Sequence, residues 1–126
     1  MIRQERLYKA NELIRVISRT GRKFFRYKDE VSRLELDTRG RVWFVDAYNG
    51  SRCYTHYTGK WRNFTNGGTL KDLIIALKDY IVKGTPVPAG HFGPWPDWCC
   101  DGDLWGYGDD MEKVREAYRR LRLGEV

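Results

Sequence analysis

A chain of 126 residues, with 41% hydrophobic and 32% charged residues, has room for one domain with a hydrophobic core and little room for a second. This composition excludes a disordered chain, and no apolar run approaches the ~20 residues that span a bilayer. The N-terminal residues lack the apolar stretch of a secretory signal, and the three cysteines make a poor disulfide framework. We therefore expect a cytoplasmic protein with no membrane partner.

The formal net charge of +6 is unevenly distributed along the chain. Residues 1–28 hold nine basic side chains against Glu5 and Glu12, whereas residues 67–108 are slightly acidic. This asymmetry favours an anionic partner at the N-terminal end, with nucleic acid as the first candidate. A solvated basic helix face is an equally good explanation of the same charges.

Apolar residues recur at helical spacing over residues 5–20 and predict an amphipathic N-terminal helix: Leu7, Ala10, Ile14 and Ile17. Arg15 and Arg19 lie largely off that stripe, so the outer face of the helix is basic. Gly21 stands where a glycine commonly ends a helix.

From Val31 the period changes to two, which predicts an antiparallel meander of three or four strands over residues 31–64. The expected turns are Asp37-Thr38-Arg39-Gly40, Asn49-Gly50 and Thr58-Gly59. Asn49-Gly50 is the strongest local signal, because a two-residue type I′ turn needs positive φ at both positions. Such a turn places Val45 opposite Tyr54 and Trp43 opposite His56.

This register divides the side chains between two sheet faces. One face mixes aromatic rings with arginines: Arg41, Trp43, Val45, Arg52, Tyr54, His56 and Trp61. The other face carries less formal charge and is the expected core layer: Val42, Phe44, Cys53, Thr55, Tyr57 and Phe64. The last expected strand is Lys60 to Phe64.

Two further helices follow, and the sequence at the start of each resembles a capping box. The first box is Thr69 to Asp72, and its central helix ends at Lys83-Gly84; the second is Asp109 to Glu112. Between the helices, prolines and glycines exclude a regular element from residues 91–108. The expected fold is a single α+β domain over residues 1–126: a three- to four-stranded antiparallel meander with N-terminal, central and C-terminal helices and an irregular loop rich in Trp, Gly and Pro.

The chain holds several potential metal ligands, most of them in the loop: Cys53, His56, His91, Cys99, Cys100, Asp101 and Asp103. Zinc sites usually use cysteines two to four residues apart, so the adjacent pair is poorly placed. An Asp97, Asp101 and Asp103 cluster for Mg²⁺ is the alternative, and the same spacing suits ordinary turns. No nucleophile elbow, phosphate-binding glycine motif or calcium loop is present. We expect no catalytic residue, metal, cofactor or small-molecule substrate.

The mixed sheet face suits nucleic acid, because aromatic rings stack on bases and arginines contact phosphates. The candidate nucleic-acid-binding residues are Arg41, Trp43, Arg52, Tyr54, His56 and Trp61, with Arg15 and Arg19 of the N-terminal helix. Alternatively, that helix covers the face and the aromatics belong to the core.

The loop suits a protein partner, because Trp and Tyr are frequent in binding hot spots and aspartates would repel phosphates. The candidate partner-binding residues are Trp95, Asp97, Trp98, Asp101, Asp103, Trp105 and Tyr107. Alternatively, the tryptophans fill the open end of the sheet.

Two parts of the chain resemble small accessory proteins encoded by phages and prophages. The stretches that carry the resemblance are Trp43–Asp46, Tyr54–Tyr57, Lys60–Phe64, Gly67–Leu70, His91–Trp95 and Asp103–Gly108. The resemblance implies a cytosolic, single-domain protein of a class in which many members block host factors, including antiviral defence complexes of the CRISPR type. It transfers no functional residue.

These observations predict a non-catalytic, phage-type accessory protein that binds and inhibits a host protein or ribonucleoprotein. Direct DNA or RNA binding through the sheet face and the basic N-terminal helix is the alternative.

Overall fold

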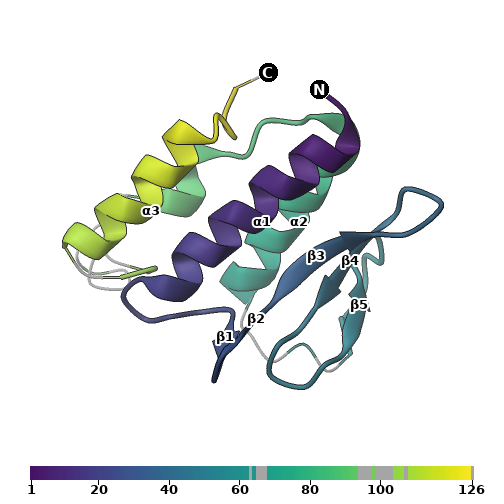
Figure 1. The fold of residues 1–126 in the computed structure, drawn as a ribbon, viewed down its shortest axis with the longest axis horizontal. Helices are drawn as coiled ribbons and strands as arrows, with labels where there is room; N and C mark the ends of the chain where they lie inside the picture. Colours follow the sequence, from purple (N-terminus) through teal and green to yellow (C-terminus); the bar gives the residue numbers. More distant parts are fainter. Residues whose placement is uncertain (63, 65–67, 94–97, 99–103, 107, 126) are drawn as a thin grey trace.

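A computed structural model describes residues 1–62, 64, 68–93, 98, 104–106 and 108–125 (Figure 1). In chain order its elements are α1 (Arg3–Arg19), β1 (Arg26–Tyr27), β2 (Glu30–Val31), β3 (Arg33–Leu36), β4 (Val42–Val45), β5 (Arg52–Tyr54), α2 (Gly68–Lys83), the 3₁₀ helix η1 (Ala89–Phe92) and α3 (Asp109–Arg120). Strands β3, β4 and β5 form one antiparallel sheet, and β1 and β2 form another. The expected α+β fold is confirmed. Among the described residues, no helix has the length and apolar character needed to cross a membrane.

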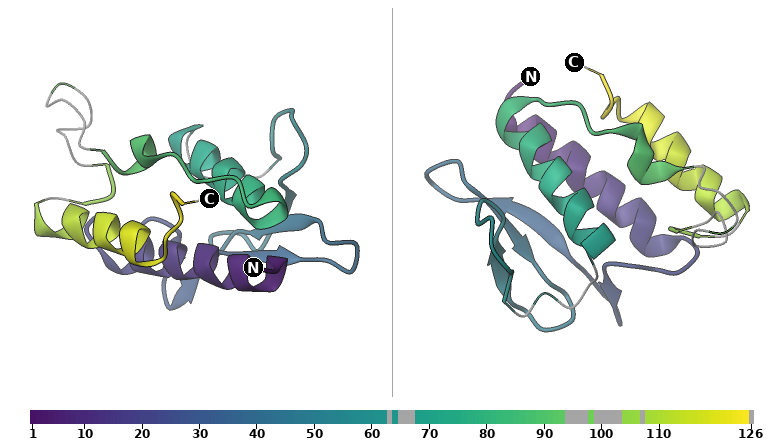
Figure 2. Two further views of the ribbon diagram at one scale, coloured as in Figure 1. Left: turned by 90° about the horizontal axis from the view of Figure 1, so that it is seen from above. Right: turned by 180° about the vertical axis from the view of Figure 1, so that it is seen from behind.

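α1 lies between α3 and the sheet and packs against α2, α3 and β3 (Figures 1 and 2). Its buried residues are Ala10, Leu13, Ile14, Ile17 and Ser18. Gly21 follows its C-terminal end with φ +49°, and a Cβ there would lie 2.2 Å from the Cα of Gly106. Glycine is therefore required at Gly21 both by its backbone conformation and by the contact with a distant segment.

Part of the N-terminal positive charge has a structural role. The Arg6 Nε donates to the carbonyl of Ile81 at 2.8 Å, and the Arg3 Nε donates to that of Val82 at 3.3 Å. Both carbonyls lie in the last turn of α2, where helix geometry leaves them without intrahelical partners. These two guanidinium groups therefore cap α2 and favour the negative end of its dipole.

The β3–β4 hairpin follows the expected turn. Asp37 N donates to Arg41 O at 3.0 Å, and Gly40 N donates to Asp37 O at 3.0 Å. Gly40 has φ +74°. A three-residue loop that ends on a left-handed glycine is the usual type I turn with a bulge.

The β4–β5 connection is longer than Asn49-Gly50 predicts. Trp43 pairs with Tyr54, and Asp46 N donates to Ser51 O at 2.9 Å, so residues 47–50 form a four-residue loop. The prediction of a two-residue type I′ turn was wrong. Such a turn needs positive φ at both residues, and Gly50 has positive φ whereas Asn49 does not. The Asn49 side chain instead accepts a hydrogen bond from Ser51 N at 2.8 Å, which stabilises a different local turn.

The predicted register of β4 and β5 is wrong by two residues. Because side chains alternate between the two faces with a period of two, each residue of β4 and β5 still lies on the face that was predicted for it. The expected core residues of β4, β5 and the position after them are buried: Val42, Phe44, Cys53 and Thr55. Two assignments beyond β5 were wrong, since Tyr57 is 57% exposed and Trp61 only 5% exposed. The Trp61 indole donates to Tyr57 O at 2.9 Å, and the described residues of the expected fourth strand are not in a strand.

The outer edge of β3 is paired with a helix side chain. Asn11 of α1 donates from Nδ2 to Leu34 O at 2.9 Å, and its Oδ1 accepts from Leu34 N at 2.8 Å. One amide thus occupies both backbone groups that a further strand would use at this position. This contact places α1 along the edge of the sheet.

The starts of the later helices differ from the expected capping boxes. α2 begins at Gly68, so Thr69 lies inside the helix, and Gly108 occupies the N-cap of α3. Glu112 N donates to the backbone carbonyl of Gly108 at 3.3 Å. The expected end of α2 is confirmed by Gly84, which has φ +74° and donates to Tyr80 O at 2.8 Å.

The Asn11→Ala substitution is expected to lower the free energy of unfolding by about 1–3 kcal/mol, because it leaves the N–H and C=O of Leu34 without partners. Urea unfolding followed by circular dichroism measures this loss. Gln4→Ala is the control, since Gln4 is exposed on the same helix. Equal losses in the two variants would show that water replaces the Asn11 amide at no cost.

The Lys28-Asp29 turn between β1 and β2 gives a second prediction, because Lys28 adopts φ +56°. Lys28→Gly should be more stable than Lys28→Ala by about 1–2 kcal/mol, since only glycine adopts this conformation without strain. Both variants lose the ammonium group 5.3 Å above the Tyr27 ring, so their difference in melting temperature isolates the backbone effect. Equal melting temperatures would contradict the prediction.

Candidate functional site

Six side chains of the three-stranded sheet lie on the side opposite the core and form what we call the open face: Arg33, Glu35, Trp43, Val45, Arg52 and Tyr54. All six are half-buried or exposed. α1 lies beside β3 and α2 packs on β4, and no described element crosses the opposite side of the sheet (Figures 1 and 2). The N-terminal helix therefore does not cover this face.

A cross-strand aromatic pair lies at the middle of the open face. Trp43 and Tyr54 stand directly opposite each other, and their ring centroids are 5.0 Å apart at an interplanar angle of 45°. The hydrogen bonds to β5 are made at neighbouring positions, including Thr55 N to Val42 O at 3.3 Å. Trp43 and Tyr54 thus form a non-hydrogen-bonded pair, the type in which side chains approach most closely.

Two arginines lie over these rings. The Arg52 guanidinium is 4.6 Å from the Trp43 ring centroid, and that of Arg41 is 5.6 Å from the Tyr54 centroid. Glu35 links Arg33 and Arg52, with Nε to carboxylate distances of 2.9 and 3.8 Å. The arginines of this surface are therefore held by aromatic and acidic neighbours on the sheet.

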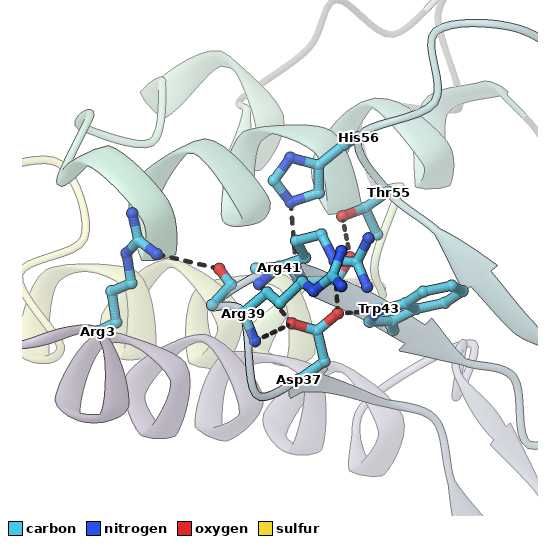
Figure 3. Close-up of polar contacts among 9 residues, drawn as sticks. Arg3, Asp37, Arg39, Arg41, Trp43, Thr55 and His56 are labelled. Atoms are coloured by element: carbon cyan, nitrogen blue, oxygen red, sulfur yellow. Dashed lines mark hydrogen bonds and ion pairs between the residues drawn. The ribbon is translucent and has the colours of Figure 1, made fainter.

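Asp37 organises one end of the open face (Figure 3). Its Oδ2 accepts hydrogen bonds from Arg41 Nε at 2.7 Å and from the Trp43 indole at 3.0 Å. Its Oδ1 accepts from the backbone N–H groups of Arg39 and Arg41, both at 2.9 Å. The indole hydrogen bond, followed by those from Arg41 and Arg39, holds the pKa of the Asp37 carboxyl well below its usual range.

His56 does not extend this surface as a cation. Its Nε2 accepts a hydrogen bond from Val42 N at 3.1 Å, which requires an unprotonated nitrogen (Figure 3). Burial and the nearby Lys78 lower the His56 pKa. Its ring stacks on Tyr54 with centroids 5.2 Å apart, so His56 supports the aromatic pair from the side.

A pocket adjoins the open face at the outer edge of β5, and we call it the β5 pocket. Its lining residues are Arg52, Cys53, Tyr54, Tyr57, Lys60, Trp61 and Arg62. Trp61, expected on the mixed face, is a buried wall of this pocket, with Lys71 Nζ 4.9 Å from its ring centroid. Lys60, Arg62 and Tyr57 are exposed.

The two described tryptophans of the expected partner-binding loop differ in exposure. Trp98 is 86% exposed, whereas Trp105 is fully buried. The Trp105 indole donates to His91 O at 2.6 Å. Its ring stacks on the Phe25 ring, and the two ring centroids are 6.4 Å apart. Trp105 is therefore a core residue, in line with the alternative that the tryptophans are buried, and it is not available as a partner-binding residue. The remaining candidates lie outside the described residues: Trp95, Asp97, Asp101, Asp103 and Tyr107.

The two helix arginines expected to assist nucleic-acid binding lie on α1. Arg15 is paired with Glu12 through an Nε to Oε1 contact of 2.9 Å, and Arg19 is exposed. α1 runs beside β3, the strand farthest from the β5 pocket in the sheet order. Arg15 and Arg19 therefore extend from the helical layer and are not part of the open face.

The sequence analysis did not identify several residues of the open face and of the β5 pocket. Those beside or on the open face are Arg33, Glu35 and Asp37, and those of the β5 pocket are Tyr57, Lys60 and Arg62. Counting outward from the Asp37–Gly40 turn pairs Glu35 with Trp43, so the register of β3 contains the signal for its members of the open face. No comparable signal exists for Lys60 and Arg62, because the Tyr57–Arg62 segment is not a strand.

The described residues contain no group of three or more acidic, His or Cys side chains arranged to hold a metal ion. The buried Cys53 thiol lies 3.8 Å from Arg62 O, and burial raises its pKa. A raised pKa disfavours the thiolate that a cysteine nucleophile requires. Cys99, Cys100, Asp97, Asp101 and Asp103 lie outside the described residues.

A family model described as YoqU matches residues 2–123 of the chain. No curated protein and no solved structure matches it significantly.

Asp37→Asn is expected to remove a pH-dependent part of the stability. Because the folded pKa of Asp37 is lowered, its contribution is present above about pH 4, the usual range of an aspartate, and is lost as the pH falls below that. Urea unfolding should show a large gap between the wild type and Asp37→Asn at about pH 7, and a smaller gap at about pH 3. The exposed Asp29 provides the control variant Asp29→Asn. A gap that does not change with pH would contradict the assignment.

Proposed function

The chain belongs to the YoqU family, and for this member we propose a non-catalytic role in which it binds a host protein or ribonucleoprotein through the open face. In this proposal the bound partner is inhibited by occupation of its surface, as expected for a phage-type accessory protein.

The observation that carries the proposal is the ordered Trp43–Tyr54 pair between Arg41 and Arg52 on an uncovered sheet face. Trp, Tyr and Arg are the residues that most often dominate the energy of protein interfaces. Hydrogen bonds to Asp37 hold Trp43 and Arg41 in place before binding. Side chains ordered in advance lose less conformational entropy on association, which favours affinity.

The charges of the surface also suit a macromolecular partner. Glu35 pairs with Arg33 and Arg52 on the open face, and Asp37 pairs with Arg41 at its end, so this surface presents both signs of charge. Mixed charges give orientation and specificity to an interface more than raw affinity. Trp98 is a candidate for a second contact, because it is the described tryptophan with the greatest exposure.

Binding to a host extract and then to the purified partner tests this function. The wild-type protein should retain a partner in a saturable one-to-one complex and inhibit it at one equivalent. Trp43→Ala and Arg52→Glu should each weaken the complex about 30-fold or more, the effect of losing an interface hot spot.

Matched variants on the helical layer control for general effects. Tyr8→Ala removes an aromatic that is 62% exposed on α1, and Arg120→Glu reverses an exposed charge on α3. Both should bind like the wild type. Equal binding by all four variants would place the interface elsewhere, and modification of the partner by substoichiometric protein would identify an enzyme.

A further inference from the structure

The β5 pocket has a composition that the open face lacks. Its lining residues include three cations, Arg52, Lys60 and Arg62, and no carboxylate. Two of its side chains are tyrosines, and one of these, Tyr57, is 57% exposed. A surface of cations and accessible aromatic rings without acids is suited to an anionic ligand that also offers flat rings.

The surrounding chain strengthens this positive character. Residues 38–71 contain six basic side chains and one acidic side chain, Asp46. Asp46 is fully buried, and its Oδ1 accepts a hydrogen bond from Tyr48 N at 2.8 Å. The exposed part of this segment therefore carries cations alone, and a pocket lined by one sign of charge concentrates counter-ions.

Two of the cations are available to a ligand. Within the described part of the chain, neither the Lys60 ammonium nor the Arg62 guanidinium forms an ion pair, whereas Arg41 is paired with Asp37 and Arg33 with Glu35. Lys71 has a structural role beside them, because its Nζ donates to Gly59 O at 3.1 Å and secures the turn that precedes Lys60. The turn presents Lys60 and Arg62 on either side of the buried Trp61.

We infer that the β5 pocket binds the phosphate backbone of a single-stranded nucleic acid, with Tyr57 stacking on an unpaired base. Lys60 and Arg62 contact phosphates, and Arg52 joins the pocket to the aromatic pair of the open face. A single strand is favoured over a duplex because only unpaired bases expose their faces to an aromatic side chain. This inference rests on the proposed function and specifies the partner as one that carries single-stranded RNA or DNA.

Fluorescence anisotropy with labelled oligonucleotides of about 12 nucleotides, a length within the usual site sizes, tests the inference. Oligo(dT), oligo(rU) and a duplex of equal length are titrated with the full chain at several salt concentrations. Single strands should bind more tightly than the duplex. Lys60→Ala/Arg62→Ala should reduce the slope of log K against log salt by about 1.4, since each phosphate contact on a single strand contributes about 0.7.

Two control variants distinguish binding at the β5 pocket from nonspecific attraction to the positive charge of the protein. Lys113→Ala/Arg120→Ala removes the same charge from exposed positions of α3 and should leave the slope unchanged. Tyr57→Ala should weaken single-strand binding about fivefold or more through lost stacking, whereas Tyr8→Ala should not. Circular dichroism confirms that each variant is folded.

Several results would overturn the inference: no binding to any oligonucleotide at low salt, equal affinity for the duplex, equal losses in the α3 control, or equally tight binding of poly-glutamate. A pocket that prefers poly-glutamate would identify an acidic protein segment as the ligand. If oligonucleotides fail to bind while Arg52→Glu still loses the host partner, the nucleic-acid inference fails and the proposed function stands. If oligonucleotides bind but the open-face variants retain the partner, the proposed function fails.

Discussion

The two hydrogen bonds between the Asn11 amide and the backbone of Leu34 determine how the helical layer meets the sheet. They hold α1 along the edge of β3, where it replaces a further strand and protects the edge from pairing with another chain. With α1 at the edge and α2 on β4, the described helices cover one face of the sheet (Figure 1). The described elements leave the opposite face open, and the arrangement of the candidate site follows from this asymmetry.

The open face and the β5 pocket beside it differ in how their charges are used. Arg33 and Arg52 of the open face are paired with Glu35, and Arg41 beside it is paired with Asp37, so these arginines are ordered but partly neutralised. Lys60 and Arg62 of the β5 pocket have no such acidic neighbour among the described residues. The first surface suits a protein partner, the second suits phosphates, and Arg52 belongs to both. A ribonucleoprotein would satisfy both sets of contacts together.

The tryptophans show why residue type alone does not identify a binding surface. Trp105 and Trp98 lie in the same unusual loop, yet one is fully buried and the other is 86% exposed. Trp105 reaches the core because the backbones of Gly21 and Gly106 approach closely, a contact between segments 85 residues apart in the chain. The same holds for Arg3 and Arg6, whose charge suggested an anionic partner and whose guanidinium groups cap α2.

The sequence by itself determined the elements whose signals are local. Helical spacing located α1, and the glycines after α1 and α2 marked their ends, because a positive φ depends on the residue itself. Alternation in β4 and β5 separated the core face from the mixed face. This assignment is correct despite a register error of two residues, because side chains alternate with a period of two. The alternation therefore placed Trp43, Arg52 and Tyr54 on the same sheet face, and the Arg41 guanidinium lies beside the Tyr54 ring.

Tertiary structure alone decided what covers each surface and which charges are already paired. No local pattern indicates that Asn11 meets Leu34, that Asp37 receives the Trp43 indole, or that Trp61 turns inward, because these contacts join side chains to groups on other elements or beyond a turn. Burial and pairing are properties of the packed molecule, since they depend on which distant segments exclude water from a side chain. For this reason the residue types of the mixed face could be predicted from the sequence, whereas its exposure, the pairing of its arginines and the unpaired β5 pocket beside it could not.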